Sequence, residues 1–296
     1  MEGFVNLHKP SGPTSHDLVV RVRRALGGVR VGHGGTLDPL AEGVLPIGIG
    51  RATRLLPFFQ EAEKVYRAEI VLGVSTTTYD ADGDVVLQCP VPPMDSQTLE
   101  ETLSAFQGTI EQIPPPFSAV HEGGRRLYER ARRGEAVAPR PRLVQIYRLQ
   151  ILAWEPPRLT LEIHCGSGTY VRSLAHDLGE RLGCGAYLAA LTRLRVGPLI
   201  LEQALSPERF EELTAHGTLG DALLPLDLPV RHWPAVILEP DQLRALLSGR
   251  ALELPSGTLP PEAQRARACH PDGSLAALLR RNVGDGLWHP FRVFGP

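Results

Sequence analysis

The chain alternates between stretches with apolar residues at every second position and stretches with apolar residues at helical spacing. Residues 65–73 and 159–163 show the first pattern, which predicts strands with one buried side. Residues 16–28 and 171–182 carry leucine and valine at intervals of four, which predicts amphipathic helices. Residues 96–107 also have a helical pattern. The chain therefore combines strands with helices.

Two segments depart from these patterns. Three consecutive prolines exclude regular structure from residues 113–120, and the following residues 121–142 are expected to form an exposed helical excursion. Beyond a composition break near 226–234, short alternating runs predict a small, mostly β domain. A length of 296 residues suits two domains, which we place at 1–228 and 229–296. The excursion is strongly basic, with Arg125, Arg126, Arg130, Arg132, Arg133, Arg140 and Arg142.

Charge and composition narrow the function classes. The formal net charge is −2, so a nucleic-acid site must come from local clustering such as the basic excursion. The four cysteines form no CxxC pair, and no stretch has 18 continuous apolar residues. The N-terminus has no apolar h-region, so we expect no signal peptide, no membrane span and a reducing cytoplasm.

Motifs of cofactor and metal chemistry are missing from the sequence. It contains no GxxxxGK[ST] and no HExxH, and its four cysteines and ten histidines form no close cluster. The acidic stretch DADGDVV approaches a calcium loop, but Val85 and Val91 stand where such a loop needs Gly and Glu. We interpret this stretch as a turn in a hairpin, and we expect neither a cofactor nor a metal.

The stretch GGTLDPLAEGVLP, residues 34–46, presents one acid, Asp38, directly before a proline. Most Asp-Pro pairs only begin turns. Here Pro39 favours an extended backbone at Asp38, and an apolar wall follows at Leu40, Val44 and Leu45. A carboxylate on a rigid turn beside apolar walls is a plausible nucleophile or base, and it needs no activation at pH 7.

Four other side chains are candidates to accompany Asp38, and each has an ordinary structural alternative. Arg172, in the first turn of a predicted helix, is either a solvated arginine or a partner for a buried aspartate. Tyr66 and Tyr170 are either core aromatics or a sandwich for a flat base. His33 is by itself more typical of a structural histidine. These residues leave open an RNA-acting enzyme with an aspartate nucleophile.

The combination of motifs closely resembles the TruB-type bacterial tRNA pseudouridine synthases. The resemblance runs nearly end to end and includes NLHKPSGPTSHDLVVRVRR, GHGGTLDPLAEGVLP, KVYRAEIVLGVSTTTYDADG, PPPFSAVHEGGRRLYERARRGE and CGSGTYVRSLAHDLGERLGCGAYLAALTRLRVG. The second and last of these blocks are highly specific. The segment ILEPDQLRALLSGRALELP resembles, more weakly, a PUA RNA-binding domain.

The resemblance implies an α+β pseudouridine synthase fold: a mixed, mainly antiparallel sheet with helices, a thumb inserted at about 113–142 and a C-terminal PUA domain. It implies conversion of uridine 55 in the tRNA T-loop to pseudouridine, by base flipping and without a cofactor. Asp38 would be the nucleophile, Arg172 its partner, and Tyr66 the ring that packs on the base. Tyr170 and Leu191 would line the pocket. His33 would help hold the loop from which the base is extruded.

Two positions depart from the family pattern: His8 replaces an acidic residue, and His121 replaces a thumb lysine, which puts one phosphate contact in doubt. The resemblance implies a cytoplasmic monomer that contacts the T-arm, and the acceptor stem through its C-terminal domain, without guide RNA. Two alternatives remain: a pseudouridine synthase for another RNA, and a non-catalytic RNA-binding or chaperone protein.

Overall fold

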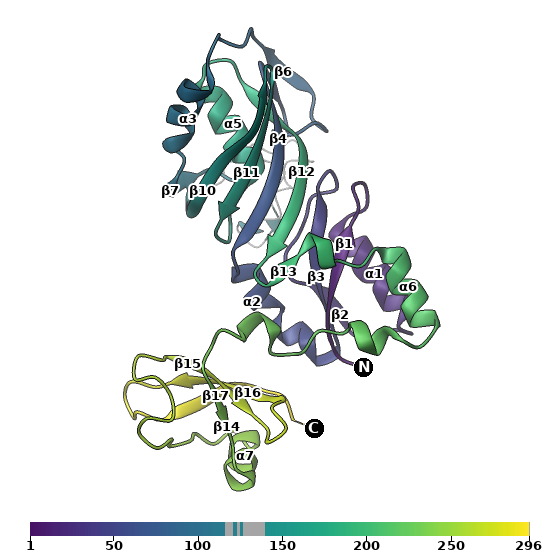
Figure 1. Ribbon diagram of the computed structural model, residues 1–296, viewed down its shortest axis with the longest axis vertical. Coiled ribbons are helices and arrows are strands. Elements are labelled where there is room, and N and C mark those ends of the chain that lie inside the picture. Colours follow the sequence, from purple (N-terminus) through teal and green to yellow (C-terminus); the bar gives the residue numbers. More distant parts are fainter. Residues whose placement is uncertain (116–120, 123–124, 127–139, 296) are drawn as a thin grey trace.

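The computed structural model describes residues 1–115, 121–122, 125–126 and 140–295. Within these residues nine strands form one sheet, in the order β1-β3-β12-β4-β11-β10-β7, with β13 beside β12 and β2 beside β3 (Figure 1). The pairings are antiparallel except that of β3 with β12. The strands are β1 Gly3–Lys9, β2 Val31–His33, β3 Glu42–Ile49, β4 Lys64–Leu72, β7 Gly108–Gln112, β10 Arg142–Glu155, β11 Arg158–Cys165, β12 Ala186–Val196 and β13 Leu199–Ile200.

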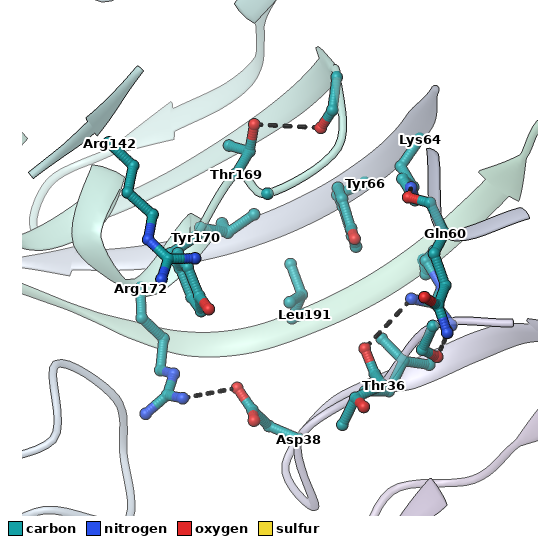
Figure 2. A pocket seen from close by; sticks show the side chains of 16 residues that line it. Thr36, Asp38, Gln60, Lys64, Tyr66, Arg142, Thr169, Tyr170, Arg172 and Leu191 are labelled. Atoms are coloured by element: carbon teal, nitrogen blue, oxygen red, sulfur yellow. Dashed lines mark hydrogen bonds and ion pairs between the residues drawn. The ribbon is translucent and has the colours of Figure 1, made fainter. Parts of the chain in front are cut away.

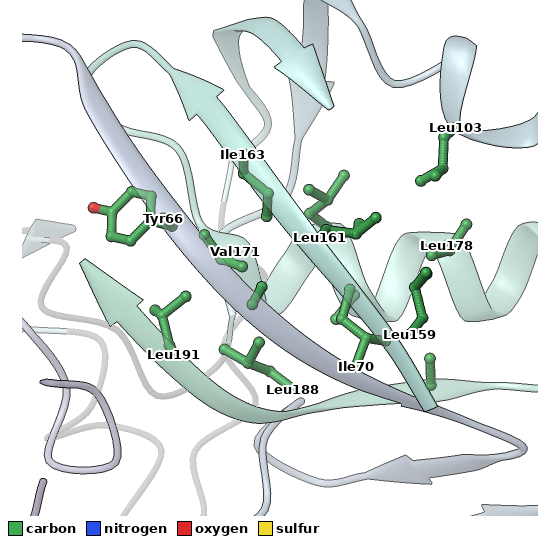
Figure 3. Close-up of a cluster of buried hydrophobic side chains, with 14 of the residues drawn as sticks. Tyr66, Ile70, Leu103, Leu159, Leu161, Ile163, Val171, Leu178, Leu188 and Leu191 are labelled. Carbon is green, nitrogen blue, oxygen red and sulfur yellow. The ribbon is translucent and has the colours of Figure 1, made fainter. Parts of the chain in front are cut away.

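The larger part of this sheet, from β12 to β7, is covered on one face by two helices. α3 (Ser96–Ser104) and α5 (Val171–Arg181) pack there (Figure 1). The alternation predicted for residues 65–73 is confirmed, because Ala68 and Ile70 of β4 are fully buried while Arg67 and Glu69 are exposed. Figure 3 shows this core, in which Ile70 and side chains of β11, β12, α3 and α5 lie together.

The smaller part of the sheet, β1, β2 and β3, packs on α1 (Ser15–Ala25) and α6 (Pro207–Ala215). Thr14 caps α1 with a capping box, and the helix ends before Gly27 and Gly28. The largely apolar stretch 45–59 divides between β3, the 3₁₀ helix η1 (Gly50–Leu55) and α2 (Leu56–Glu61).

The two parts of the large sheet join where β12 meets β3 in parallel, at Thr192–Glu42 and Arg193–Gly43. The backbones approach so closely here that a Cβ on Gly43 would lie 2.3 Å from the Arg193 carbonyl oxygen. Gly43 also has a φ of +112°, which other residues rarely adopt. This junction brings the 34–41 loop, which precedes β3, next to β4 and β12.

Residues 235–293 form a four-stranded sheet in the order β14-β15-β16-β17, next to the helix α7 (Pro240–Leu247). Its strands are Ala235–Ile237, Arg265–Cys269, Leu275–Arg281 and Trp288–Val293. Leu278 and Phe294 are buried in one cluster with Phe4 and Phe59, so this sheet packs on the end of the large one. The exact division at residue 228 stays a prediction.

The remaining described elements are short. β5 (Val74–Thr76) and β6 (Val85–Gln88) form the predicted hairpin around residues 77–84. β8 (His121–Glu122) pairs with β9 (Arg125–Arg126), so the helix predicted for residues 121–142 is wrong at these four positions. Backbone pairing between the two segments is incompatible with helical bonding there. Three 3₁₀ helices follow β13: η2 Leu201–Gln203, η3 Leu219–Ala222 and η4 Leu228–Val230.

No helix among the described residues is long and apolar enough to span a membrane.

Candidate active site

The loop that carries Asp38 is a hydrogen-bonded turn between β2 and β3. The backbone carbonyl oxygen of Asp38 accepts a hydrogen bond from the Ala41 amide at 3.0 Å. This bond closes a four-residue turn with Pro39 at its second position. The Ser15 hydroxyl, at the start of α1, accepts from the Leu37 amide at 2.8 Å and lies 3.0 Å from the Leu37 carbonyl oxygen. The loop is therefore attached to a helix terminus directly beside Asp38.

Lys9, at the end of β1, supports this turn from behind. Its side chain is fully buried, and its Nζ donates to the carbonyl oxygens of Ala41 at 2.6 Å and Pro39 at 3.2 Å. The Gly12 amide donates to the same Pro39 carbonyl at 2.8 Å. Burial lowers the pKa of Lys9 to about 8. The negative charge of the nearby Asp38 opposes part of this shift. The N-terminal KPSG motif thus has a structural task that the sequence did not indicate.

Arg193 of β12 supports the loop from the other end. This arginine is 1% exposed, and its guanidinium donates to the carbonyl oxygens of Val44 at 2.7 Å, Gly35 at 3.0 Å and Thr36 at 3.3 Å. A buried cation with its donors paired to carbonyl oxygens avoids much of the penalty of burial. With Lys9 and Arg193 at its two ends, the turn holds Asp38 in one position.

The Asp38 carboxylate forms an ion pair with Arg172. The distance from Arg172 Nη2 to Asp38 Oδ2 is 2.9 Å, as Figure 2 shows. The Asp38 side chain is 44% exposed, whereas that of Arg172 is 7% exposed. The surrounding walls desolvate the carboxylate and raise its pKa above the ordinary value, while the charge of Arg172 opposes this shift. The carboxylate is thus much more exposed to the pocket than its partner.

A second carboxylate, that of Asp80, holds Arg172 from the far side. Arg172 Nη1 lies 3.3 Å from Asp80 Oδ2 and donates to the Thr78 carbonyl oxygen at 3.3 Å. Asp80 is only 7% exposed at its side chain, and it accepts a bond from the Asp82 amide at 3.1 Å. The sequence interpretation of DADG as a simple turn missed this function. The nearest signal was the position of this stretch inside a motif block of the family pattern.

A pocket of about 640 Å³ opens beside Asp38. Tyr66 of β4 and Leu191 of β12 form its floor, and Tyr170 and Arg172 form a side (Figure 2). Burial raises the pKa of Tyr66, so its hydroxyl stays protonated at neutral pH and its ring presents a neutral surface. The structure therefore brings together five of the six main residues predicted from sequence. The lining of this pocket also includes residues that the sequence did not single out as pocket residues: Thr36, Gln60, Lys64, Arg142, Thr169 and Arg193.

The sixth predicted residue, His33, ends β2 and is not among the pocket-lining side chains. Its Nδ1 accepts a long bond of 3.4 Å from the Gly35 amide, and burial lowers its pKa. It contacts the start of the Asp38 loop, and its task towards a flipped base stays a prediction. The N-cap of α5 is Tyr170, and the hydroxyl of the preceding Thr169 donates to the Gly166 carbonyl oxygen at 3.2 Å.

The predicted thumb arginines are only partly described. The backbones of Arg125 and Arg126 lie in β9, and Arg130, Arg132 and Arg133 fall outside the described residues, so their RNA contacts stay a prediction. In the described part of the chain, no three His, Cys, Asp or Glu side chains gather as metal ligands would. The expectation of cofactor-free chemistry likewise stays a prediction.

Chemically, the site offers one reachable carboxylate against an apolar floor. Arg172 fixes the direction of Asp38 and favours its ionised form, while the flat ring of Tyr66 and the side chain of Leu191 provide a surface for a planar group. Around Asp38, the described lining also contains the cationic side chains of Lys64 and Arg142, so the pocket suits a ligand that is planar and anionic. A nucleotide has both properties.

Comparisons with known proteins agree with this geometry. Residues 23–171 match the model of the TruB family pseudouridylate synthase N-terminal domain, and residues 172–231 match that of the tRNA pseudouridylate synthase B C-terminal domain. The PUA resemblance beyond residue 231 stays a prediction. The chain is similar to tRNA pseudouridine synthase B of Dehalococcoides mccartyi, with 41% identity covering 99% of this chain and 97% of the relative. It is 48% identical to that of Gloeobacter violaceus, covering 84% and 86%.

Among solved structures, a Cbf5-Nop10-Gar1 complex contains a similar chain, with a TM-score of 0.75, 26% identity, and coverage of 99% of this chain and 85% of that one. An H/ACA RNP bound to a substrate RNA contains another, with a TM-score of 0.74, coverage of 99% and 85%, and 24% identity, a likeness that concerns the fold alone. These matches confirm the α+β pseudouridine synthase fold. The chain belongs to the TruB family of pseudouridylate synthases.

Proposed function

We propose that this chain isomerises uridine to pseudouridine at position 55 in the T-loop of tRNA, with Asp38 as the nucleophile. The observation that carries the proposal is the Asp38 carboxylate itself, which is held by Arg172 at 2.9 Å and exposed to a pocket of nucleotide size. The relatives named tRNA pseudouridine synthase B support tRNA as the substrate. Position 55 follows from the motif resemblance.

The reaction exchanges one glycosidic bond for another. The bond between N1 of uracil and C1′ of ribose breaks, the uracil turns within the pocket, and C5 bonds to C1′. The C5 proton leaves to solvent and N1 gains a proton, so atoms and charge balance without a further reactant. A nucleophile that attacks either C6 of the base or C1′ of the sugar weakens the first bond, and Asp38 serves both routes.

The neighbouring side chains divide the remaining tasks. Arg172 aims Asp38 and stabilises its charge. The Tyr66 ring packs on the uracil, and Leu191 and Tyr170 confine the base while it turns. His33 contacts the Asp38 loop and is placed to hold it during extrusion of the base.

RNA binding outside the pocket supplies the energy for base flipping, which costs a few kcal/mol. We assign the T-arm to the thumb with Arg125, Arg126, Arg130, Arg132 and Arg133, and the acceptor stem to the 229–296 domain. Both act mainly through phosphate contacts, so binding should weaken as salt increases. The enzyme acts as a cytoplasmic monomer, and no guide RNA is needed because the thumb provides the grip.

The test is tritium release from a tRNA transcript labelled at uracil C5, since only C5–C1′ bond formation expels that hydrogen. We expect release equivalent to one uridine per tRNA, and none from a transcript with cytidine at position 55. Binding without release would favour a non-catalytic RNA chaperone. Continued tritium release from the cytidine transcript would refute the assignment of position 55. Tritium release from ribosomal RNA but not from tRNA would refute tRNA as the substrate.

A further inference from the structure

The loop that supplies the acceptors for Arg172 has an unusual residue at its centre. Thr78 offers its carbonyl oxygen and Asp80 its carboxylate to the same guanidinium, and Tyr79 lies between them. Tyr79 has a φ of +64°, the left-handed region that an L-residue with a large side chain rarely adopts. A conformation of this kind persists where the surroundings hold it in place.

The ring of Tyr79 stacks on the ring of His176. The centroids are 3.8 Å apart and the planes differ by 5°. His176 follows Arg172 by four residues on α5, so both project from the same side of the helix. The buried Nδ1 of His176 has no hydrogen-bond partner within the described chain, so the ring contributes here through stacking. The stack therefore joins the 77–84 loop to the helix that carries Arg172.

Other bonds of this loop run to the sheet or remain within the loop and β5. The Tyr79 carbonyl oxygen accepts from the Leu188 amide of β12 at 3.0 Å, and the Thr76 hydroxyl donates to the Asp80 carbonyl at 2.7 Å. These bonds fix the loop relative to β12. The ring stack and the Arg172 bonds are the contacts described here that join the loop directly to α5.

We propose that Tyr79 and His176 are positioning residues that set the place of Arg172 and, through it, the direction of Asp38. Neither ring lines the pocket, so neither is placed to touch a base that enters it. In this proposal the stack keeps the Thr78 and Asp80 oxygens near Nη1 of Arg172, while Nη2 of the same guanidinium pairs with Asp38. The kinetic part of the test rests on the proposed function; the titration described below does not.

The main variants are His176→Ala and Tyr79→Gly, compared with His176→Phe. Glycine adopts a positive φ freely, so Tyr79→Gly removes the ring without disturbing the backbone. We expect kcat to fall about tenfold or more in both, because small displacements of a catalytic group are costly, while KM changes less than twofold. His176→Phe keeps a flat ring at the same place and should restore kcat to within about twofold of wild type.

The second readout is the titration of the Asp38 carboxyl, followed by NMR of ¹³C-labelled aspartate in the protein without RNA. The charged groups that face Asp38 are Arg172, Asp80 and Lys9. If Arg172 moves away, its opposition to the raised pKa weakens. The Asp38 titration should then shift to higher pH in His176→Ala and Tyr79→Gly but remain unchanged in His176→Phe.

The matched control is His164→Ala, which removes the tilted Tyr147–His164 ring contact elsewhere on the sheet and should leave the Asp38 titration unchanged. An unchanged titration in both main variants overturns the proposal, whether or not kcat falls, because a purely structural loss would lower activity without moving it. If His176→Ala does not fold, Tyr79→Gly decides. An inactive wild type whose variants still shift the titration would contradict only the proposed function.

Discussion

Two acidic loops bind the same arginine, and they differ in what else they reach. The 34–41 loop presents Asp38, 44% exposed, to the pocket, while the 77–84 loop presents Asp80, 7% exposed, to a buried side of Arg172. Both carboxylates form ion pairs with one guanidinium, through different nitrogen atoms. Exposure thus separates their tasks: Asp38 can meet a substrate, and Asp80 can only act on Arg172.

The loops are also built differently. The Asp38 turn is held by the buried cations Lys9 and Arg193, whose donors reach backbone carbonyl oxygens. The Asp80 loop is held by hydrogen bonds within the loop and to β5, by backbone bonds to Leu188 of β12, and by one ring stack. Backbone anchoring leaves the Asp38 carboxylate free for chemistry, whereas the Asp80 carboxylate is itself used as an anchor. Asp38 is thus positioned through its backbone by Lys9 and Arg193, and through its side chain by Arg172.

The largest expected effect comes from Asp38→Asn, which keeps the shape and removes the nucleophilic charge. We expect kcat to fall by at least about a thousandfold, as for other lost nucleophiles, with tRNA affinity within a few-fold of wild type. Tritium release and filter binding measure the two quantities. Full activity in this variant would refute the assignment of Asp38.

Next is Arg172→Ala, which removes the partner that both loops share. We expect about a hundredfold loss in kcat, because a preorganised charge next to the reacting group is lost. Arg172 opposes the raised pKa of Asp38, so its removal lets that pKa rise further. Activity requires ionised Asp38 and is lost as pH falls through this pKa. The acidic limb of the pH–rate profile should therefore move to higher pH, and a shift in the other direction would contradict the pairing.

A smaller effect is expected from Asp80→Asn, which keeps a polar side chain and removes the buried charge. We expect kcat to fall about tenfold, less than for either residue at the pocket, because Asp80 acts only through Arg172. The variant should also unfold more easily, since removing one partner of a buried pair costs up to about 3–5 kcal/mol. Denaturant unfolding and tritium release are the measurements. A loss as large as that of Asp38→Asn would erase the distinction between the loops.

The sequence predicted the role of the exposed acid, Asp38, but not that of the buried acid, Asp80. Asp38 stood out because an acid before Pro39, between glycines and an apolar run, is a local pattern. Asp80 lies in a stretch with the composition of an ordinary turn, and its partner Arg172 is 92 residues away in the chain. A contact of this kind depends on the register of β4, β11 and β12, which local patterns do not encode.

Similar reasoning applies to the cations and to the fold. Burial of Lys9 and Arg193 could not be read from the sequence, because lysine and arginine are usually exposed. The strands of 65–73 and 159–163 were predictable from alternation, since one face is buried by α3 and α5. Residues 121–122 and 125–126 depart from the helix predicted for this basic segment, because an arginine-rich composition is compatible with a helix but the backbone at these four positions pairs as strands.

The smallest expected effect concerns the support of the Asp38 loop, tested with Lys9→Met. Burial lowers the pKa of Lys9 from 10.5 to about 8 in the folded chain. Between these values the unfolded chain binds the proton and the folded chain does not, so this residue makes the free energy of unfolding increase as pH rises from about 8 to 10.5. The penalty for burying the charged amine is fully present below pH 8. We therefore expect the stability of wild type relative to Lys9→Met to increase across that window, by an amount on the order of 1–3 kcal/mol.

Denaturant unfolding at several pH values measures the difference, in which groups common to both proteins cancel. A relative stability that stays flat or decreases would show that Lys9 is solvated and does not hold the turn, and the contrast between the two loops would then rest on Arg193 alone.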